Sequence, residues 1–397
     1  MLTDDQVLRV IGRDKPLFFS DLETHRADID ARLNGARVLV IGAAGSIGNA
    51  TTKILASFAP AELHLVDINE NELADLVRQL RVSRLLNDKT DLRTFVIDVN
   101  SQSFLGFCRD GREYDFVFNL SAMKHVRSES NVYSLARMIE TNVLATNRVI
   151  AELAKNSEFK YFCVSTDKAA NPVNLMGCSK LVMENYAFSN NAGIAVSSAR
   201  FANVAFSNGS LLQSFDRRMQ EHQPLVIPQG IKRFFVSQSE AGAICVLSGV
   251  LAPHRGILVP SEAADLHLIP FEDIVTAYLE IQGYAPEFVD EDAVPATPRP
   301  GDKTWPVIVS KVDTTGEKPF EEFVGNGEDL SDSPFSDLSL VVKQSAPPDL
   351  SLEEFENRLS KLIQSGSSKK IDYVNLLTDS GASLSYSDLG KYLDDKI

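Results

Sequence analysis

Short apolar runs alternate with longer segments of helical periodicity over roughly the first half of the chain. The first run, residues 36–41 (ARVLVI), is apolar and β-branched and ends at Gly42, which is typical of a buried strand. A helical pattern follows, with apolar side chains at Ile47, Ile54 and Leu55, and Pro60 ends it. The same reasoning predicts further strands at 62–67, 92–98, 114–120, 159–166 and 195–204, and helices at 71–86 and 134–156.

This alternation predicts the α/β fold class. Strands separated by helices of this length form a parallel sheet covered on both faces, because each connection must return across the sheet before the next strand begins. We therefore expect a Rossmann-like, doubly wound parallel sheet over residues 36–205, together with part of 232–260.

The segments outside this domain have weaker patterns. Two short helices are expected at 4–11 and 20–33, which makes residues 1–35 an N-terminal helical extension. Beyond residue 205 the alternation becomes irregular and prolines are frequent, so residues 206–335 are expected to form a smaller substrate-binding lobe. Acidic, proline-containing stretches at 290–302 and 326–336 read as loops. An amphipathic pattern at 350–364 predicts a C-terminal helical extension over 336–397.

Composition excludes several classes of protein. The 39 basic and 54 acidic residues give a net charge of −15, which disfavours a nucleic-acid partner. The chain has no apolar run long enough to span a membrane and no signal-like start, so we expect a cytoplasmic protein. The four cysteines are far apart and lack partners at ligand spacing, which predicts reduced, mostly buried thiols and no metal site.

A glycine-rich loop joins the first strand to the first helix of the domain. It reads Gly42-Ala-Ala44-Gly45-Ser46-Ile47-Gly48, and Asp67 ends the second strand nineteen residues after Gly48. Glycines at this spacing let backbone N–H groups approach a pyrophosphate at the helix N-terminus. An acid at position 67 can accept both ribose hydroxyls and repels a 2′-phosphate, which favours NAD over NADP. The alternative for Asp67 is a turn-capping carboxylate.

Two further positions are expected to carry chemistry at the same edge of the sheet. Asp98 and Val99 follow the third strand and are placed to meet the adenine. Thr166, Asp167 and Lys168 follow the fifth strand, and ligands of open α/β sheets collect beyond the carboxyl ends of the strands. A hydrogen-bonded loop with a surface acid and lysine is the alternative for these three residues.

The sequence resembles the extended short-chain dehydrogenase/reductase superfamily. Within it, the chain is most similar to the UDP-N-acetylglucosamine 4,6-dehydratases of bacterial polysaccharide biosynthesis. The resemblance covers roughly residues 36–330 and rests on the glycine loop and on residues 121–126 (SAMKHV), 141–146 (TNVLAT), 165–180, 200–204 (RFANV), 233–235 (RFF) and 316–318 (GEK). Residues 11–14 (IGRD) are also similar to the lead-in of the family's membrane-attached long forms.

One position departs from the superfamily pattern. Lys180 matches the lysine of its Tyr-x-x-x-Lys pair, but Met176 stands where the tyrosine is expected. A methionine has no proton to exchange, so the departure allows two interpretations. One branch of these dehydratases carries methionine there and is active, which places the chain in that branch. The alternative is a catalytically silent NAD-binding scaffold.

The resemblance implies a reaction and a role for each residue. A 4,6-dehydratase oxidises C4 of the sugar with NAD, removes the C5 proton, expels the C6 hydroxyl as water and returns the hydride to C6. Lys168 is the implied C5 base and Asp167 the acid for the leaving hydroxyl. Thr166 is expected to bind the C4 oxygen, and Lys180 the nicotinamide ribose. The implied substrate-binding residues are Lys124, His125, Asn203 and Arg233.

Several alternatives stay open at this point. A nucleotide-sugar epimerase, or a dehydratase that also inverts C5, would use the same transient oxidation. Lys124 can instead pair with a nearby carboxylate. The nucleotide base can be uridine, guanosine or thymidine, and the acceptor of the C4 hydroxyl proton is undefined. We also expect a homodimer or higher homo-oligomer, with helix 134–156 at the interface because its apolar positions exceed one narrow stripe.

Overall fold

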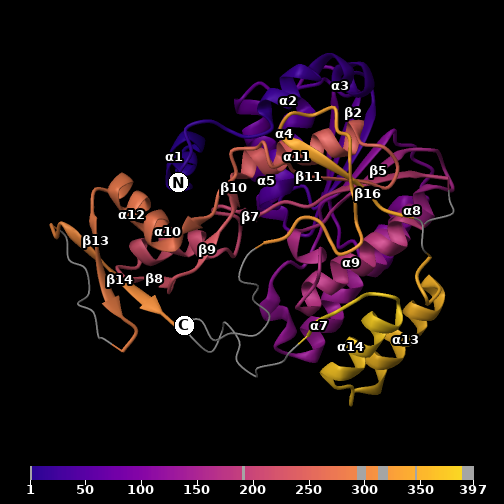
Figure 1. The fold of residues 1–397 in the computed structure, drawn as a ribbon. Coiled ribbons are helices and arrows are strands. Elements are labelled where there is room, and N and C mark those ends of the chain that lie inside the picture. Colours follow the sequence, from indigo (N-terminus) through magenta and orange to yellow (C-terminus); the bar gives the residue numbers. More distant parts are fainter. Residues whose placement is uncertain (1, 190–192, 293–300, 312–320, 345–346, 387–397) are drawn as a thin grey trace.

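The computed structural model describes residues 2–189, 193–292, 301–311, 321–344 and 347–386. Figure 1 shows a large lobe built around one sheet and a smaller lobe to its left. Within the described residues, the large sheet has nine strands in the order β15-β16-β11-β6-β5-β4-β1-β2-β3. Their bounds are β1 Arg37–Ile41, β2 Glu62–Asp67, β3 Asp91–Val96, β4 Phe116–Asn119, β5 Lys160–Val164, β6 Ala195–Ala199, β11 Gly256–Pro260, β15 Leu330–Ser331 and β16 Leu338–Val342.

The strands from β3 to β11 are parallel, and the order 3-2-1-4-5-6 is that of a doubly wound Rossmann-like sheet. This confirms the predicted fold class. The order reverses between β1 and β4, and ligands of such sheets bind at that switch point. The predicted strands agree with β1 to β6 to within a few residues, except that 195–204 divides into β6 and the short β7, Asn203–Val204.

Alternation along β1 shows why both faces of the sheet are covered. Val38 and Val40 pack into one apolar cluster, and Leu39 and Ile41 into another. Helices over the first face are α2 Phe19–Thr24, α3 Arg26–Leu33, α4 Ser46–Ala56, α5 Glu70–Val82 and α11 Gln238–Leu251. Helices over the second face are α6 Gln102–Arg109, α8 Ala145–Leu153 and α9 Leu175–Phe188.

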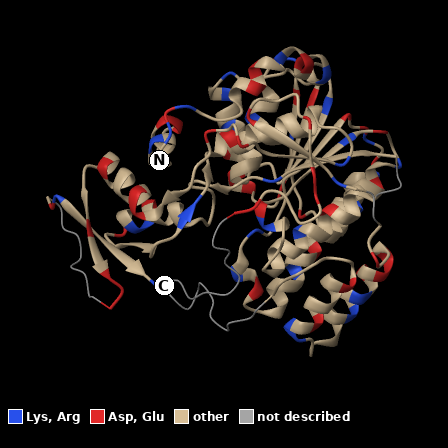
Figure 2. Cartoon of the chain, viewed as in Figure 1, with Lys and Arg blue, Asp and Glu red and all other residues tan. Residues whose placement is uncertain are grey.

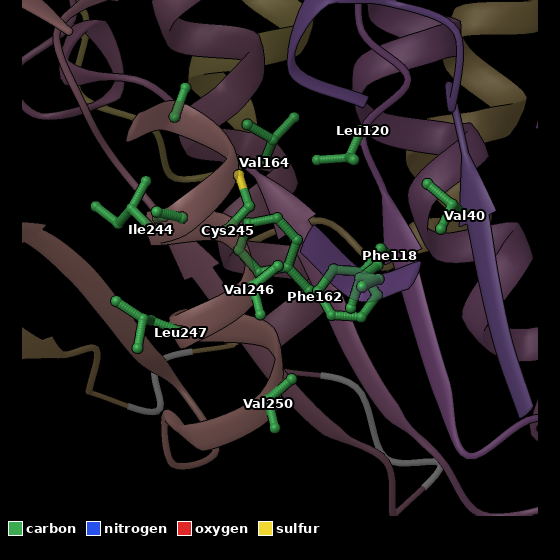
Figure 3. Packing of buried hydrophobic residues seen from close by; sticks show 14 of the residues in the cluster. Val40, Phe118, Leu120, Phe162, Val164, Ile244, Cys245, Val246, Leu247 and Val250 are labelled. Atoms are coloured by element: carbon green, nitrogen blue, oxygen red, sulfur yellow. The ribbon is translucent and has the colours of Figure 1, made fainter. Parts of the chain in front are cut away.

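Helix α11 forms the centre of the first face. Figure 3 shows Ile244, Cys245, Leu247 and other α11 side chains packed against residues of β1, β4 and β5. The rings of Phe118 and Phe162 from neighbouring strands lie 5.7 Å apart under this helix. Both α11 and β11 therefore belong to the large lobe, as the sequence suggested for part of 232–260.

The smaller lobe has its own apolar cluster. It contains a three-stranded parallel sheet and two helices, with the bounds β8 Leu225–Pro228, β13 Ala285–Asp290, β14 Thr304–Ser310, α10 Leu211–Gln220 and α12 Phe271–Gln282. Two short strand pairs connect the lobes: β7 with β10, Phe235–Val236, and β9, Lys232–Arg233, with β12, Ile269–Pro270.

The N-terminal extension contacts both lobes. Helix α1, Asp4–Val10, packs into the cluster of the smaller lobe, whereas α2 and α3 pack on α11. Between them, Arg13 makes a buried ion pair of 2.6 Å with Glu240, which also caps the N-terminus of α11. This places the 11–14 stretch at the junction of the two lobes.

The predicted boundary at residue 336 is corrected by the structure. Strand β16 pairs antiparallel with β11, and β15 pairs antiparallel with β16, so residues 330–342 extend the large sheet. The signal was the short run LSLVV, in which Leu338 and Val341 are buried, but the acidic residues before it masked the pattern. The helical part of the C-terminal extension is α13 Leu352–Ser365 and α14 Lys370–Asp379.

Helices α13 and α14 cover the face that the sequence predicted to bind a second copy. The predicted helix 134–156 is α7 Val132–Ile139, a π-helical turn Glu140–Leu144 and α8. Leu135, Met138 and Ile139 lie in one cluster with Phe355 of α13 and Leu376 of α14. The apolar positions on which the interface prediction rested are therefore already covered, and both the interface and the oligomeric state stay predictions.

The structure also shows how the charges and the cysteines are distributed and whether any described helix could span a membrane. Acidic and basic residues are interspersed over both lobes in Figure 2. In the part of the chain that the structure describes, no helix combines the length and the apolarity needed to cross a bilayer. All four cysteines are free and buried, as predicted, and burial raises the pKa of the Cys163 thiol to about 12.

Candidate active site

The glycine loop turns tightly between β1 and α4. Gly42 has φ of +75°, and a side chain there would lie 2.6 Å from the backbone nitrogen of Ser121. A Cβ on Gly48 would lie 1.9 Å from the Gly42 carbonyl oxygen, so only glycine lets α4 pack this close to the loop. Gly45 precedes α4 as its N-cap and lines a cavity at the switch point. The loop therefore leaves the N-terminus of α4 open to an anion.

The cavity beside this loop has a volume of about 440 Å³. Five predicted cofactor residues line it: Gly42, Gly45, Asp67, Asp98 and Val99. Asp67 accepts hydrogen bonds from the backbone nitrogens of Ala44 and Asn69, both at 2.9 Å. The carboxylate thus braces the glycine loop, which is the turn-capping role, while it also lines the cavity.

Three further predicted cofactor residues support the loop without lining the cavity. Ala44 donates to Asp67, and the Ser46 hydroxyl accepts a hydrogen bond of 2.8 Å from the backbone nitrogen of Asn208. Ile47 packs against the apolar cluster under α11. Asn208 lies in the smaller lobe and also lines the cavity, so this lobe closes over the glycine loop.

Asp98 has a partner that the sequence analysis missed. Arg137 of α7 forms an ion pair with its carboxylate and lines the same cavity. The carboxylate also accepts from the backbone nitrogen of Asn100 at 2.9 Å. Arg137 lies far from Asp98 in the sequence and has no motif around it, so only the folded chain could reveal the pair.

Residues 121–125 lie between the cavity and the smaller lobe. The buried Asn142 in the π-helical turn holds them, because its amide both accepts from the backbone nitrogen of Met123 and donates to the Met123 carbonyl, each at 3.0 Å. Lys124 donates to the Ser207 hydroxyl at 3.0 Å, and the His125 ring packs directly against Gly209. Burial, followed by the charges of Lys124 and Arg127, lowers the pKa of His125.

Thr166, Asp167 and Lys168 are brought together at the end of β5. Thr166 donates from its hydroxyl to Asp167 at 2.7 Å, and the Lys168 ammonium lies 3.3 Å from the same carboxylate oxygen. The Asp167 side chain is 4% exposed, whereas that of Lys168 is 31% exposed. A buried acid thus connects a hydroxyl with an accessible amine, and this arrangement can pass a proton along one short chain.

A buried network of charged residues supports the loop that follows β5. Ser165 donates to Glu184 at 2.6 Å, and Arg200 binds Glu184 and Glu328 through its guanidinium. Burial alone would raise the pKa of Glu184, but the charges of Arg200 and Lys343 and the hydrogen bonds outweigh it and hold this pKa at about 2. Arg200 is fully buried here, so it positions the active-site strand and is closed to a ligand.

Lys180 and Met176 lie on α9, which packs against the loop containing Thr166, Asp167 and Lys168. The buried Lys180 ammonium donates to the Val164 carbonyl at 3.0 Å, and burial lowers its pKa to about 8. Met176 is 3% exposed and packs in the cluster formed with α13 and α14. The methionine is therefore part of the hydrophobic core on the side of the C-terminal helices.

Three polar groups meet where the short strands β7 and β9 connect the lobes. Asn203 donates from its amide to Glu321 at 2.6 Å, and the Arg233 guanidinium lies 3.5 Å from the same carboxylate oxygen. Glu321 also interacts electrostatically with Asp167 and Lys168. Sequence reasoning missed Glu321, although it follows residues 316–318 (GEK), which lie outside the described residues.

Comparisons with known proteins place this geometry in a family. A family model described as "Polysaccharide biosynthesis protein" matches residues 38–327. An uncharacterized membrane protein of Methanocaldococcus jannaschii is 31% identical over 316 residues, which are 77% of this chain and 86% of the relative. A UDP-N-acetylglucosamine 4,6-dehydratase (inverting) of Campylobacter jejuni is 33% identical over 57% of this chain and 67% of the relative.

Other similarities concern length and fold. The matches span about half the length of the EpsC protein of Bacillus subtilis and the CapD protein of Staphylococcus aureus, 48% and 51% respectively. The structure of Pen from Bacillus thuringiensis has a TM-score of 0.63 at 20% identity, covering 79% of this chain and 90% of the other. WbmF of Bordetella bronchiseptica, solved with NAD+ and UDP, has a TM-score of 0.52 at 18% identity, covering 64% and 79%.

The family match covers most of the Rossmann-like lobe and the smaller lobe. The relative from Methanocaldococcus jannaschii aligns over a similar share of this chain. The chain, with its glycine loop and its Thr166–Lys168 triad, belongs to the polysaccharide biosynthesis protein family.

Proposed function

We propose that this protein is an NAD-dependent nucleotide-sugar 4,6-dehydratase of polysaccharide biosynthesis. The family supports a reaction of the nucleotide-sugar dehydratase or epimerase type. The proposed substrate is UDP-N-acetylglucosamine, on which the Campylobacter jejuni relative acts by name. The observation that carries the proposal is the hydrogen-bonded chain Thr166–Asp167–Lys168 at the end of β5.

The cofactor is NAD. Gly45 at the N-terminus of α4 leaves room for a pyrophosphate, and Asp67 faces the cavity with a carboxylate that repels a 2′-phosphate. Bound NAD supplies a hydride acceptor for C4 oxidation and returns the hydride to C6. Lys180 is proposed to contact the nicotinamide ribose. To do so, its ammonium must give up its hydrogen bond to the Val164 carbonyl.

Asp167 and Lys168 provide acid and base from one ion pair. Transfer of a proton from the Lys168 ammonium to the Asp167 carboxylate, across 3.3 Å, leaves a neutral amine and a protonated carboxyl. The amine can then take the C5 proton, and the carboxyl can protonate the departing C6 oxygen. Thr166 is proposed to hold the C4 oxygen. Positioned groups of this kind each contribute about 10²–10⁴ in rate.

The smaller lobe is proposed to hold the nucleotide diphosphate. Arg233 has a planar fork that suits two phosphate oxygens, and Asn203 lies beside it through the shared contact with Glu321. Lys124 and His125 are proposed to bind the sugar or the diphosphate from the facing loop. Their contacts with Ser207 and Gly209 place both against the smaller lobe.

The proposal is tested by mass spectrometry of purified protein with UDP-N-acetylglucosamine and, in parallel, with GDP- and dTDP-linked sugars. We expect loss of one water from the uridine substrate, without net consumption of added NAD. Denatured protein should release NAD and no NADP. An isomer of unchanged mass would indicate an epimerase, and no conversion of any sugar would indicate an NAD-binding scaffold.

A further inference from the structure

The proposed reaction lacks an acceptor for the proton of the C4 hydroxyl. Oxidation of an alcohol requires that the O–H proton leave when the C–H hydride does. The superfamily position that matches a tyrosine is occupied by Met176, which has no ionisable group and is buried against the C-terminal helices. Asp167 already accepts from Thr166 and Lys168, and the proposal assigns it to the C6 oxygen. Another group must take the C4 proton.

Glu321 is a buried carboxylate near the Thr166–Lys168 loop, and only one of its two oxygens is used in contacts with neighbouring side chains of the described residues. Its side chain is 5% exposed, and its Oε1 accepts from the Asn203 amide at 2.6 Å and faces the Arg233 guanidinium at 3.5 Å. Within the described ranges, its Oε2 is buried and has no hydrogen-bond partner. A buried carboxylate oxygen without a partner costs free energy, and such a group calls for a ligand or a catalytic role.

Glu321 belongs to a segment that packs against the loop containing Asp167 and Lys168. It interacts electrostatically with both Asp167 and Lys168, so the three ionisable groups lie near one another. The Asn171 side chain fixes the segment, because its Nδ2 donates to Glu322 at 3.2 Å and its Oδ1 accepts from the backbone nitrogen of Asn326 at 2.7 Å. The segment 321–328 is thereby docked on the catalytic loop.

We propose that Glu321 is a further catalytic residue of the site and accepts the proton of the sugar hydroxyl that is oxidised. This inference rests on the proposed dehydratase function. In the step, the O–H bond breaks and its proton goes to Oε2 of Glu321, while the C4–H electron pair leaves as hydride to NAD. A C4=O bond forms, so the alcohol is oxidised by two electrons and the cofactor is reduced by two.

The electrostatic surroundings agree with a proton acceptor. Burial raises the pKa of Glu321, the nearby Asp167 raises it further, and the charges of Arg233 and Lys168 oppose both effects. A carboxylate with a raised pKa binds a proton more readily than an ordinary surface acid does. Arg233 and Asn203 hold only Oε1, which leaves Oε2 to receive the proton.

The test compares Glu321→Gln with the matched control Glu322→Gln. The glutamine at 321 keeps an oxygen for Asn203 but cannot take a proton, so turnover should fall by about 10²–10⁴ while bound NAD is retained. With substrate deuterated at C4, the isotope effect on turnover should increase, because hydride transfer becomes rate-limiting. The control removes the neighbouring negative charge but keeps an oxygen for Asn171, and should change turnover by at most a few-fold.

A pH profile separates catalysis from positioning. If Glu321 takes the proton as a carboxylate, kcat in the native protein should rise with pH through the raised pKa of Glu321. That limb should disappear in Glu321→Gln and persist in Glu322→Gln. A merely structural role predicts instead a raised KM with the limb intact, and this result would overturn the proposal. Glu321→Asp, which retains a carboxylate, should regain part of the turnover and serves if the glutamine variant does not fold.

One more measurement distinguishes failure of this inference from failure of the proposed function. The 4-keto-6-deoxy product already has its ketone, so exchange of its C5 proton with D₂O needs Lys168 but no C4 oxidation. Glu321→Gln should exchange this proton at the native rate. If the native protein dehydrates the substrate and Glu321→Gln does so at the same rate, only the role of Glu321 is overturned. No dehydration by the native protein would overturn the proposed function.

Discussion

The cofactor side and the sugar side of the site are assembled differently. The glycine loop, Asp67, Asp98 and Val99 come from residues 41–100 and are held largely by local hydrogen bonds, to which Arg137 and Asn208 add contacts from outside that stretch. The sugar side combines the Thr166–Lys168 triad with Asn203, Arg233 and Glu321, which lie on segments far apart in the sequence. Changes on the cofactor side should therefore act through local packing, and changes on the sugar side through single ionisable groups.

The largest effect is expected for Asp167→Asn and Lys168→Met. Each removes one member of the acid–base pair, so turnover should fall by about 10²–10⁴. Neither residue lines the cofactor cavity, and NAD content after purification should match that of the native protein. Lys155→Met removes an exposed lysine that lies just after α8 and pairs with Glu152, and it serves as the control. Near-native rates in both test variants would leave the loop with a structural role.

The buried network under the triad should matter for stability more than for chemistry. Glu184→Gln leaves the fully buried Arg200 with Glu328 as its remaining carboxylate partner, and breaking a buried pair typically costs about 3–5 kcal/mol. Urea denaturation should register this loss. The control is Glu356→Gln, which breaks a partly exposed pair with Arg148 and should cost about 0–1 kcal/mol. Equal losses in the two variants would contradict the network's supporting role.

Acid should weaken the same network. The folded-state pKa of Glu184 is about 2, against an ordinary value of 4.5, so the carboxylate stabilises the fold at neutral pH. Its contribution is fully present above the unfolded pKa and is lost as the pH falls through the folded pKa. We expect the free energy of unfolding to fall between about pH 5 and pH 2 in the native protein. Glu184→Gln should show a smaller decrease over that range.

On the cofactor side, Gly48→Ala should act by overpacking. Its Cβ would lie 1.9 Å from the Gly42 carbonyl oxygen, and such crowding costs about 1–3 kcal/mol. The displaced loop should also lower the NAD content of the purified protein. Gly106→Ala is a matched control, because nothing lies within 4 Å of the added carbon in α6. An alanine at 48 that leaves both stability and NAD content unchanged would show that the loop is adaptable.

The same difference explains what the sequence could predict. The strand, glycine loop and Asp67 lie close together in the chain, so their spacing was enough to predict the fold and the cofactor side. Arg137, Asn208 and Glu321 each reach the site across a long separation and have no spacing rule of their own. The cover of α13 and α14 over α7 was missed for a similar reason, since an amphipathic pattern shows that a face is apolar but not what covers it.

The most direct test of the account is the fate of the C5 proton when UDP-N-acetylglucosamine reacts in D₂O, followed by NMR and mass spectrometry. The native protein should give a product that has lost one water and carries solvent deuterium at C5. Asp167→Asn should exchange the C5 proton with little loss of water, and Lys168→Met should do neither. Free C5 exchange in Lys168→Met without exchange in Asp167→Asn would reverse the two roles. Dehydration at the native rate in both variants would contradict the assignment of the chemistry to this loop.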